Sequence, residues 1–285
     1  MPHKDELVNL LYEKARILRR HAIEMMRQAG QGWLGGSFSE AEIITALYFH
    51  HMRHDPKNPG WPERDRLVLS KAHCCEMLYA ALGEAGYFTK DQFLSYGRFK
   101  GLLQAHSQRT TPGVDYSGGS LGTGLSFAVG SALAARISSS KSSSGLKPFR
   151  YRVYCIVGDG ECDEGQIWEA AMAAAHYRLD NLTVILDRNR YQSTGPVSET
   201  MEIEPLAEKW SSFGWNVIEI DGHDIRQILE ALEDANRAYC KPTIIIANTI
   251  KGKGAPSLEG SVHFISITEK IYSEVVEALE KQKAE

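Results

Sequence analysis

Residues 152–189 read RVYCIVGDGECDEGQIWEAAMAAAHYRLDNLTVILDRN, and this stretch decides the fold. One hydrophobic run ends at Gly158-Asp159-Gly160, and a second run ends shortly before Asn189. The segment 164–177 between the runs is rich in alanine and predicts a helix. A strand, a helix and a strand in this order form a right-handed crossover that joins two parallel strands. The stretch therefore predicts an α/β fold built on a parallel sheet.

Oxygen-bearing side chains follow both predicted strands, Asp159 after the first and Asn189 after the second. The carboxyl ends of parallel strands meet at one edge of the sheet, so we expect both side chains in a ligand site there. A carboxylate and an amide oxygen suit Mg²⁺, and the glycines beside Asp159 let phosphate oxygens approach the backbone. A Gly-Asp-Gly alone is usually a simple turn. Because it occurs here within this strand-helix-strand unit, it predicts a magnesium and diphosphate site.

Length and composition narrow the class of protein. The 285 residues can bury a full core, and we expect a single domain over 1–285. The net charge of -4, with both signs interspersed, predicts no nucleic-acid partner and no membrane surface. Five cysteines without framework spacing indicate a reducing compartment, and no signal-like segment occurs at the N-terminus, so we expect a cytoplasmic protein.

Four further segments flank the central stretch. Apolar residues at helical spacing predict one long helix or two abutting helices over 5–29. Ser39-Glu40-Ala41-Glu42 resembles a capping box that opens the next helix. A short strand at 66–69 leads to His73, and Asp224 is expected to cap the helix that follows it.

A glycine-rich turn, 118–124, precedes a predicted helix of small and apolar residues. Backbone N–H groups at such a helix start can bind a ligand, but the glycines can equally serve close packing. After that helix, the Ser-rich residues 138–145 predict a flexible surface loop within the domain.

The motifs together resemble those of one family. GDGECDEGQIWEA followed by LTVILDRN resembles the thiamine-diphosphate signature of transketolases. Further segments match in the same order: LSKAH at 69–73, LLQAH at 102–106, GGSLGTGL at 118–125, DGHD at 221–224 and KGKG at 251–254. The likeness extends from about Gly30 to His263 and is greatest to the N-terminal subunits of split transketolases.

The resemblance implies an open, mostly parallel sheet with helices on both faces, which binds the diphosphate of thiamine diphosphate through Mg²⁺. It implies metal ligands at Asp159, Asn189 and the backbone carbonyl of Tyr191. The other implied positions fall into three groups: cofactor-binding His73, Gly119, Ser120, Leu121, Gly160, Asn189 and His263; catalytic His73, His106 and His263; and Glu164 at a subunit interface.

The resemblance also implies a partner. In the family, the glutamate that activates the cofactor's aminopyrimidine ring belongs to a second domain, which this chain does not contain. We therefore expect a C-terminal transketolase-like subunit that carries the pyrimidine-binding domain, a heterotetramer, and no turnover by this chain alone.

The main departure from the family pattern is Trp33, which replaces a histidine that contacts the donor ketose. Smaller changes occur at SKAH, at Ala105-His106-Ser107 and at Val262-His263-Phe264. Trp33 either alters the donor preference or turns away and packs in the core. Either way, the cofactor motifs are intact.

The predicted activity is transfer of a ketol or acyl unit from a ketose-like or 2-oxo-acid donor to a small-molecule acceptor, with a non-standard donor. One alternative is a deoxyxylulose-phosphate synthase-like or 2-oxo-acid decarboxylating subunit. Another is a catalytically inert regulatory or scaffold subunit, against which the motif residues Asp159 and Asn189 argue.

Overall fold

The computed structural model describes residues 4–139 and 150–281. The strands are β1 Gln31–Gly32, β2 Arg66–Leu69, β3 Val153–Gly158, β4 Leu182–Arg188, β5 Asn216–Asp221, β6 Thr243–Asn248 and β7 Ile265–Ser266. The α-helices are α1 Asp5–Ala29, α2 Leu34–Ser39, α3 Ala41–Ala46, α4 Cys75–Ala85, α5 Thr123–Ser139, α6 Gly165–His176, α7 Val197–Thr200, α8 Leu206–Ser212, α9 Ile225–Arg237 and α10 Glu269–Lys281. A π-helix, η1 Leu47–His51, and three 3-10 helices, η2 Ala72–Cys74, η3 Lys90–Ser95 and η4 Gly160–Asp163, complete the described elements.

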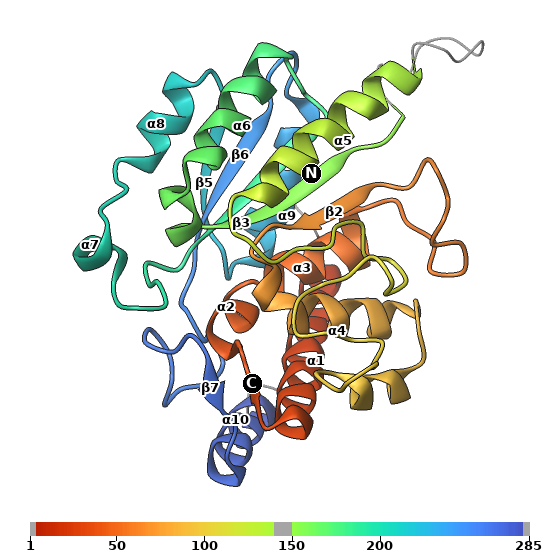
Figure 1. The fold of residues 1–285 in the computed structure, drawn as a ribbon, viewed down its shortest axis with the longest axis vertical. Coiled ribbons are helices and arrows are strands. Elements are labelled where there is room, and N and C mark those ends of the chain that lie inside the picture. The colour runs from red at the N-terminus through yellow and green to blue at the C-terminus, as the bar shows by residue number, and fades with distance from the viewer. Residues whose placement is uncertain (1–3, 140–149, 282–285) are drawn as a thin grey trace.

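Five strands form a parallel sheet in the order β2-β3-β4-β6-β5 (Figure 1). The predicted crossover is confirmed: α6 connects β3 to β4, and Gly158 at the end of β3 is in register with Asp187 in β4. Every strand of this sheet is parallel to its neighbours. All its carboxyl ends therefore lie along one edge.

Alternating side chains divide the core into two layers. Cys155 and Val184 pack against α5, α6 and α8 on one face, whereas Tyr154 and Ile185 pack against α1, α3, α4 and α9 on the other. Parallel strands covered on both faces bury both sets of alternating residues, which explains their continuous hydrophobic runs. Figure 1 shows α5 and α6 in front of the sheet and α1 to α4 below it. The predicted fold class, a sheet with helices on both faces, is confirmed.

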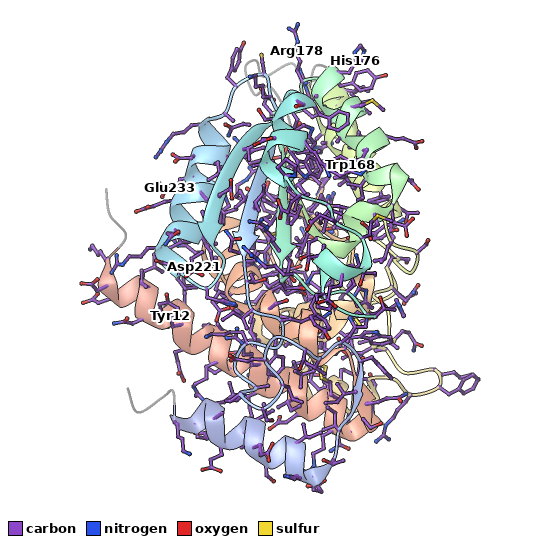
Figure 2. All side chains as sticks on the ribbon, turned by 90° about the vertical axis from the view of Figure 1, so that its left-hand side faces the viewer. Tyr12, Trp168, His176, Arg178, Asp221 and Glu233 are labelled. Atoms are coloured by element: carbon purple, nitrogen blue, oxygen red, sulfur yellow. The ribbon has the colours of Figure 1, made fainter. Side chains whose placement is uncertain are left out.

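The N-terminal helix is one continuous element, since α1 extends from Asp5 to Ala29 without a break. Gly30 ends it with φ 78°, a left-handed conformation that glycine adopts without steric cost. Tyr12 on α1 reaches the turn after β5, where its hydroxyl donates to the carbonyl of His223 at 3.2 Å. Figure 2 labels Tyr12 and Asp221 on these two neighbouring elements.

Three local expectations have different outcomes. Asp224 caps α9 as predicted, accepting from the N–H groups of Arg226 and Gln227. The capping box at Ser39 is wrong, because its hydroxyl donates to Gly36 O and to Asp187 and caps no helix. Of the predicted loop at 138–145, Ser138 and Ser139 belong to α5, and 140–145 lie outside the described residues.

A small antiparallel pair was not predicted. β1 and β7 pair through Gln31 with Ser266 and through Gly32 with Ile265. Each strand has two residues, too few for a periodic pattern to show. The pair brings the segment after α1 beside the segment that contains His263. Separately, no helix in the described part of the chain is long and apolar enough to cross a membrane.

Candidate active site

A pocket of about 290 Å³ lies at the carboxyl edge of the sheet. Its walls come from the loops after β2, β3, β4 and β6 and from the segment between α1 and α2. Most of the predicted site residues line it, namely Trp33, His73, His106, Leu121, Asp159, Gly160, Asn189, Tyr191 and His263. Parallel topology thus brings together residues that are far apart in sequence.

Asp159 is buried at the start of η4 and accepts two backbone hydrogen bonds. Gly160 N–H donates to Oδ1 at 2.7 Å, and Arg190 N–H donates to Oδ2 at 2.5 Å. Arg190 adopts φ 64°, a strained conformation for a residue with a side chain, which turns its N–H toward the carboxylate. Burial, together with the nearby Asp187 carboxylate, raises the pKa of Asp159 to about 7. The site therefore favours a positive charge beside Asp159.

Asn189 and Tyr191 place two neutral oxygens near Asp159. Asn189 donates through Nδ2 to Asp187 at 3.0 Å, so its Oδ1 is oriented and accepts only the weaker 3.2 Å bond from Tyr191 N–H. The carbonyl of Tyr191 accepts from Lys251 Nζ at 2.6 Å. Burial lowers the pKa of Lys251 to about 8 despite the nearby carboxylates.

These residues fit a magnesium-bound diphosphate. A buried carboxylate, an oriented amide oxygen and a backbone carbonyl are all hard oxygen donors, which Mg²⁺ prefers. Within residues 4–139 and 150–281, no group of three or more His, Cys, Asp or Glu side chains is arranged around a metal position. A metal here would consequently need phosphate or water oxygens to complete its shell, as Mg²⁺ commonly does.

A buried ion cluster borders the pocket at Lys71, and it was not predicted from the sequence. Lys71 Nζ lies 2.6 Å from Asp187 and 2.8 Å from Glu40, and it donates to Gly36 O at 3.0 Å. Burial alone would lower the pKa of Lys71, but the Asp187 carboxylate raises this pKa well above its usual value. Burial raises the pKa of Glu40 to about 8, and neither Glu40 oxygen has hydrogen-bonding geometry with a described residue.

Glu161 connects three of the pocket's loops and was also missed. Its Oε1 accepts from Ser70 at 2.5 Å and from Gly122 N–H at 2.8 Å, and its Oε2 accepts from Gly158 N–H at 3.1 Å. The sequence held a signal for both the ion cluster and Glu161. Lys71, Asp187 and Glu161 are polar residues directly beside hydrophobic strand runs, and such residues must find buried partners.

The three predicted histidines gather on one side of the pocket. The rings of His73 and His263 have centroids 5.2 Å apart. All three residues line the pocket, and none of their rings forms a hydrogen bond with another described residue, so their nitrogens are free for a ligand. Burial lowers the pKa of all three, that of His263 to about 4. At neutral pH they are uncharged and offer one donor and one acceptor each.

Trp33 faces the pocket and does not pack away in the core. Its ring centroid lies 5.1 Å from that of His106, 4.7 Å from that of Phe264 and 6.2 Å from that of His73. The core-packing alternative is therefore wrong. Compared with the histidine that the family has at this position, Trp33 narrows the pocket and replaces polar surface with a larger aromatic ring.

Three predicted residues lie outside the pocket lining. Gly119 and Ser120 are exposed on the turn before α5, and only their neighbour Leu121 reaches the pocket. Glu164 is exposed at the N-terminus of α6, against the same turn: a Cβ at Gly122 would lie 2.9 Å from Glu164 Cβ. Their cofactor-binding and interface roles stay predictions.

Comparison with known families identifies the chain. Residues 11–272 match the family model described as transketolase, thiamine diphosphate binding domain. The chain belongs to the transketolase family. Its cofactor is accordingly thiamine diphosphate, with Mg²⁺ as the usual companion metal of the family.

Two relatives are named as subunits of transketolases. The chain is 46% identical to the 6-deoxy-6-sulfo-D-fructose transketolase subunit SqwG of Clostridium sp. (strain MSTE9), over 96% of this chain and 98% of that one. It is 37% identical to an apulose-4-phosphate transketolase subunit of Phocaeicola vulgatus, over 93% and 94% of the two chains. Such relatives imply a partner subunit for this transketolase-like chain.

Solved transketolases share the fold but are longer. The transketolase from Campylobacter jejuni superposes with a TM-score of 0.90 at 33% identity, over 96% of this chain and 43% of that one. This transketolase-family chain therefore corresponds to less than half of the solved enzyme.

Proposed function

We propose that this chain is the diphosphate-binding half of a two-component transketolase-like enzyme with a non-standard donor. The observation that carries the proposal is the convergence of Asp159, Asn189 and Tyr191 with three free histidine rings in one pocket of a transketolase-family fold. An inert scaffold would not need to keep a buried carboxylate such as Asp159 away from a cationic side chain, because burying a charge without a counter-charge costs stability.

Each group has a distinct role in the proposal. Asp159, Asn189 and the Tyr191 carbonyl hold Mg²⁺, and Gly160 allows the diphosphate close to the backbone. The bound thiamine diphosphate supplies the carbanion chemistry of the family, and the protein supplies orientation and proton transfer. His73, His106 and His263 are neutral, so they bind donor hydroxyls and can pass protons at their ring nitrogens.

The partner completes the site. We propose a C-terminal transketolase-like subunit that carries the pyrimidine-binding domain, assembled with this chain as a heterotetramer. Two observations support this: the chain spans only 43% of a solved transketolase, and its relatives from split enzymes match it over nearly their whole length. The exposed Glu164 beside the turn at Gly122 would lie in this interface.

The donor is a ketose outside the common pentulose and hexulose phosphates. Trp33 presents one N–H on a large apolar body where the family has a histidine, which changes both the size and the polarity of the donor end. According to their names, the relatives act on 6-deoxy-6-sulfo-D-fructose and on apulose 4-phosphate. A deoxyxylulose-phosphate synthase-like or 2-oxo-acid decarboxylating activity is the second candidate, since the apolar ring at Trp33 also suits a donor without a terminal hydroxyl.

A donor panel with the reconstituted enzyme tests this. The panel contains 6-deoxy-6-sulfo-D-fructose, apulose 4-phosphate, xylulose 5-phosphate, fructose 6-phosphate and pyruvate, each with an aldose acceptor. We expect one of the first two donors to give the highest kcat/KM. Highest kcat/KM with pyruvate would favour the second candidate, and highest kcat/KM with xylulose 5-phosphate would contradict a non-standard donor.

A further inference from the structure

Glu76 in α4 is a fully buried carboxylate without a counter-ion. It forms no ion pair with any residue in the described ranges, and burial raises its pKa. A buried carboxylate costs several kcal/mol unless hydrogen bonds satisfy it. An apolar side chain at this position of α4 would avoid that cost, so Glu76 must satisfy a local requirement.

That requirement is visible in its partners. Oε1 accepts from the backbone N–H of Trp33 at 2.9 Å and from the hydroxyl of Tyr96 at 2.6 Å. Oε2 accepts from the hydroxyl of Ser37 at 2.8 Å. Two of the three donors belong to the segment that contains Trp33, and a backbone N–H can only donate. Glu76 thus holds this segment at both Trp33 and Ser37.

The same segment is enclosed on its other sides. A Cβ at Gly32 would lie 2.3 Å from Met26 Cγ and 2.9 Å from Glu76 Oε1. A Cβ at Gly35 would lie 1.9 Å from the carbonyl oxygen of Val262. Glycines at both positions let the backbone settle between α4 and the loop that contains His263. Trp33 lies between these two glycines, so its main chain has little freedom.

We propose that Glu76 is the positioning residue that fixes Trp33 against His106 and Phe264, and that it thereby sets the shape of the pocket at the donor end. The proposal rests on the proposed function for its effect on donors, but the placement of Trp33 is independent of turnover. Glu76 lies outside the pocket lining and acts through the segment that it holds at Trp33 and Ser37.

Substitutions at Glu76 separate hydrogen bonding from charge. In Glu76→Gln, the amide oxygen can still accept from Trp33 N–H and Tyr96, and the amide NH₂ can donate to Ser37 Oγ, so all three bonds survive. Glu76→Met has a similar length but no comparable acceptor, and it leaves the Trp33 N–H unsatisfied. Tyr96→Phe removes one of the two donors on Oε1.

The first readout is ¹⁹F NMR of the full-length chain labelled with 5-fluorotryptophan. The Trp33 resonance is assigned by its loss in Trp33→Phe. We expect this resonance to shift or broaden in Glu76→Met, to change less in Tyr96→Phe and to remain near its original position in Glu76→Gln. The other four tryptophans serve as internal controls for the fold.

The second readout is donor choice in the reconstituted enzyme. We expect Glu76→Met to raise the donor KM and to change the ratio of kcat/KM between two donors by at least about fivefold. Glu76→Gln should keep the ratio of the wild type. Calorimetry with thiamine diphosphate and Mg²⁺ should give one affinity for all variants.

The outcomes are distinct. A folded Glu76→Met with an unchanged Trp33 resonance would overturn the proposal, and so would an unchanged resonance in Tyr96→Phe if Glu76→Met does not fold. Absence of cofactor binding by the wild-type complex would contradict the proposed function, while the NMR result would still decide the placement of Trp33.

Discussion

Asp159 is the residue on which cofactor binding should depend most. It is the one carboxylate of the predicted metal set. Burial raises its pKa by disfavouring the charged form, and a bound divalent cation would stabilise that form. We expect Asp159→Ala to weaken thiamine diphosphate and Mg²⁺ binding by about tenfold or more, which corresponds to ~1.4 kcal/mol. Calorimetry with the partner present measures this. Glu169→Gln, an exposed change on α6, is the control, and equal affinities in all three proteins would remove Asp159 from the metal site.

Trp33 should control which donors are accepted. Trp33→His restores the polar nitrogens that the family has at this position, and one recovered hydrogen bond commonly changes selectivity by ~1–3 kcal/mol. We expect the variant to turn over xylulose 5-phosphate faster relative to the native donor. Trp33→Phe keeps an aromatic ring without the N–H and should gain nothing. Unchanged donor ratios in Trp33→His would mean that other residues set the specificity.

At the scale of elements, α5 offers a matched pair of glycines. A Cβ at Gly124 would lie 2.5 Å from Ser70 Oγ and 2.6 Å from Ser70 Cα, whereas nothing lies within 4 Å of a Cβ at Gly130. We expect Gly124→Ala to lower the free energy of unfolding by about 1–3 kcal/mol through overpacking. Gly130→Ala, on the exposed side of the same helix, should raise it by about 0.5–1 kcal/mol. Denaturant unfolding checks both, and equal effects would mean that α5 does not pack on β2 in this way.

A buried ion pair joins α1 to α3 and gives a pH-dependent prediction. Arg19 binds Glu42 with both terminal nitrogens, at 2.5 and 2.8 Å, and His223 Nδ1 lies 3.0 Å from Glu42. Burial raises the pKa of Glu42, but Arg19 and His223 outweigh it and lower the pKa from 4.5 to about 2. The pair therefore stabilises the fold fully above pH 4.5, and this contribution is lost as the pH falls toward about 2.

Glu42→Gln should accordingly cost about 3–5 kcal/mol at neutral pH, because it leaves Arg19 buried without a counter-charge. The difference between the wild type and the variant should shrink as the pH is lowered from 4.5 toward 2. Urea unfolding at several pH values measures it. A difference that stays constant with pH would show that Glu42 is not ionised in the way described.

The sequence predicted the elements with strong periodic signals. β3, α6 and β4 follow from their hydrophobic pattern, and the Asp224 cap follows from side-chain chemistry. Ser39 shows the limit of such patterns, since its hydroxyl donates a hydrogen bond to Asp187 in β4, a residue far away in sequence. The β1–β7 pair was equally unpredictable, because it depends on tertiary contacts between two short segments.

The pocket illustrates the same division. Asp159 and Asn189 were predictable because a parallel sheet places strand ends together, and Trp33 stood out against the family pattern. The ion cluster of Lys71, Glu40 and Asp187 was not predicted, because only packing shows that the residues of three separate segments share one buried site. Local sequence specifies the strand ends, and the assembled core specifies their partners.

At the scale of the whole molecule, we expect the chain to need a partner subunit for turnover. It spans 43% of a solved transketolase, and its relatives are named as subunits. We expect the purified chain to form no carbanion-derived product with any donor, since the group that activates the cofactor ring belongs to the partner in the proposed assembly. An assay for product formation by the purified chain alone checks this, and turnover without another protein would contradict it.

Reconstitution tests most directly whether this chain is one half of a thiamine-diphosphate enzyme. Donor turnover is measured with this chain, with the partner subunit, with both together, and with the partner plus Asp159→Ala, each with thiamine diphosphate and Mg²⁺. We predict full turnover only in the mixture of the two wild-type subunits. In the mixture that contains Asp159→Ala, we expect turnover to fall by about tenfold or more. Turnover by either subunit by itself, or full activity of the mixture with Asp159→Ala, would contradict it.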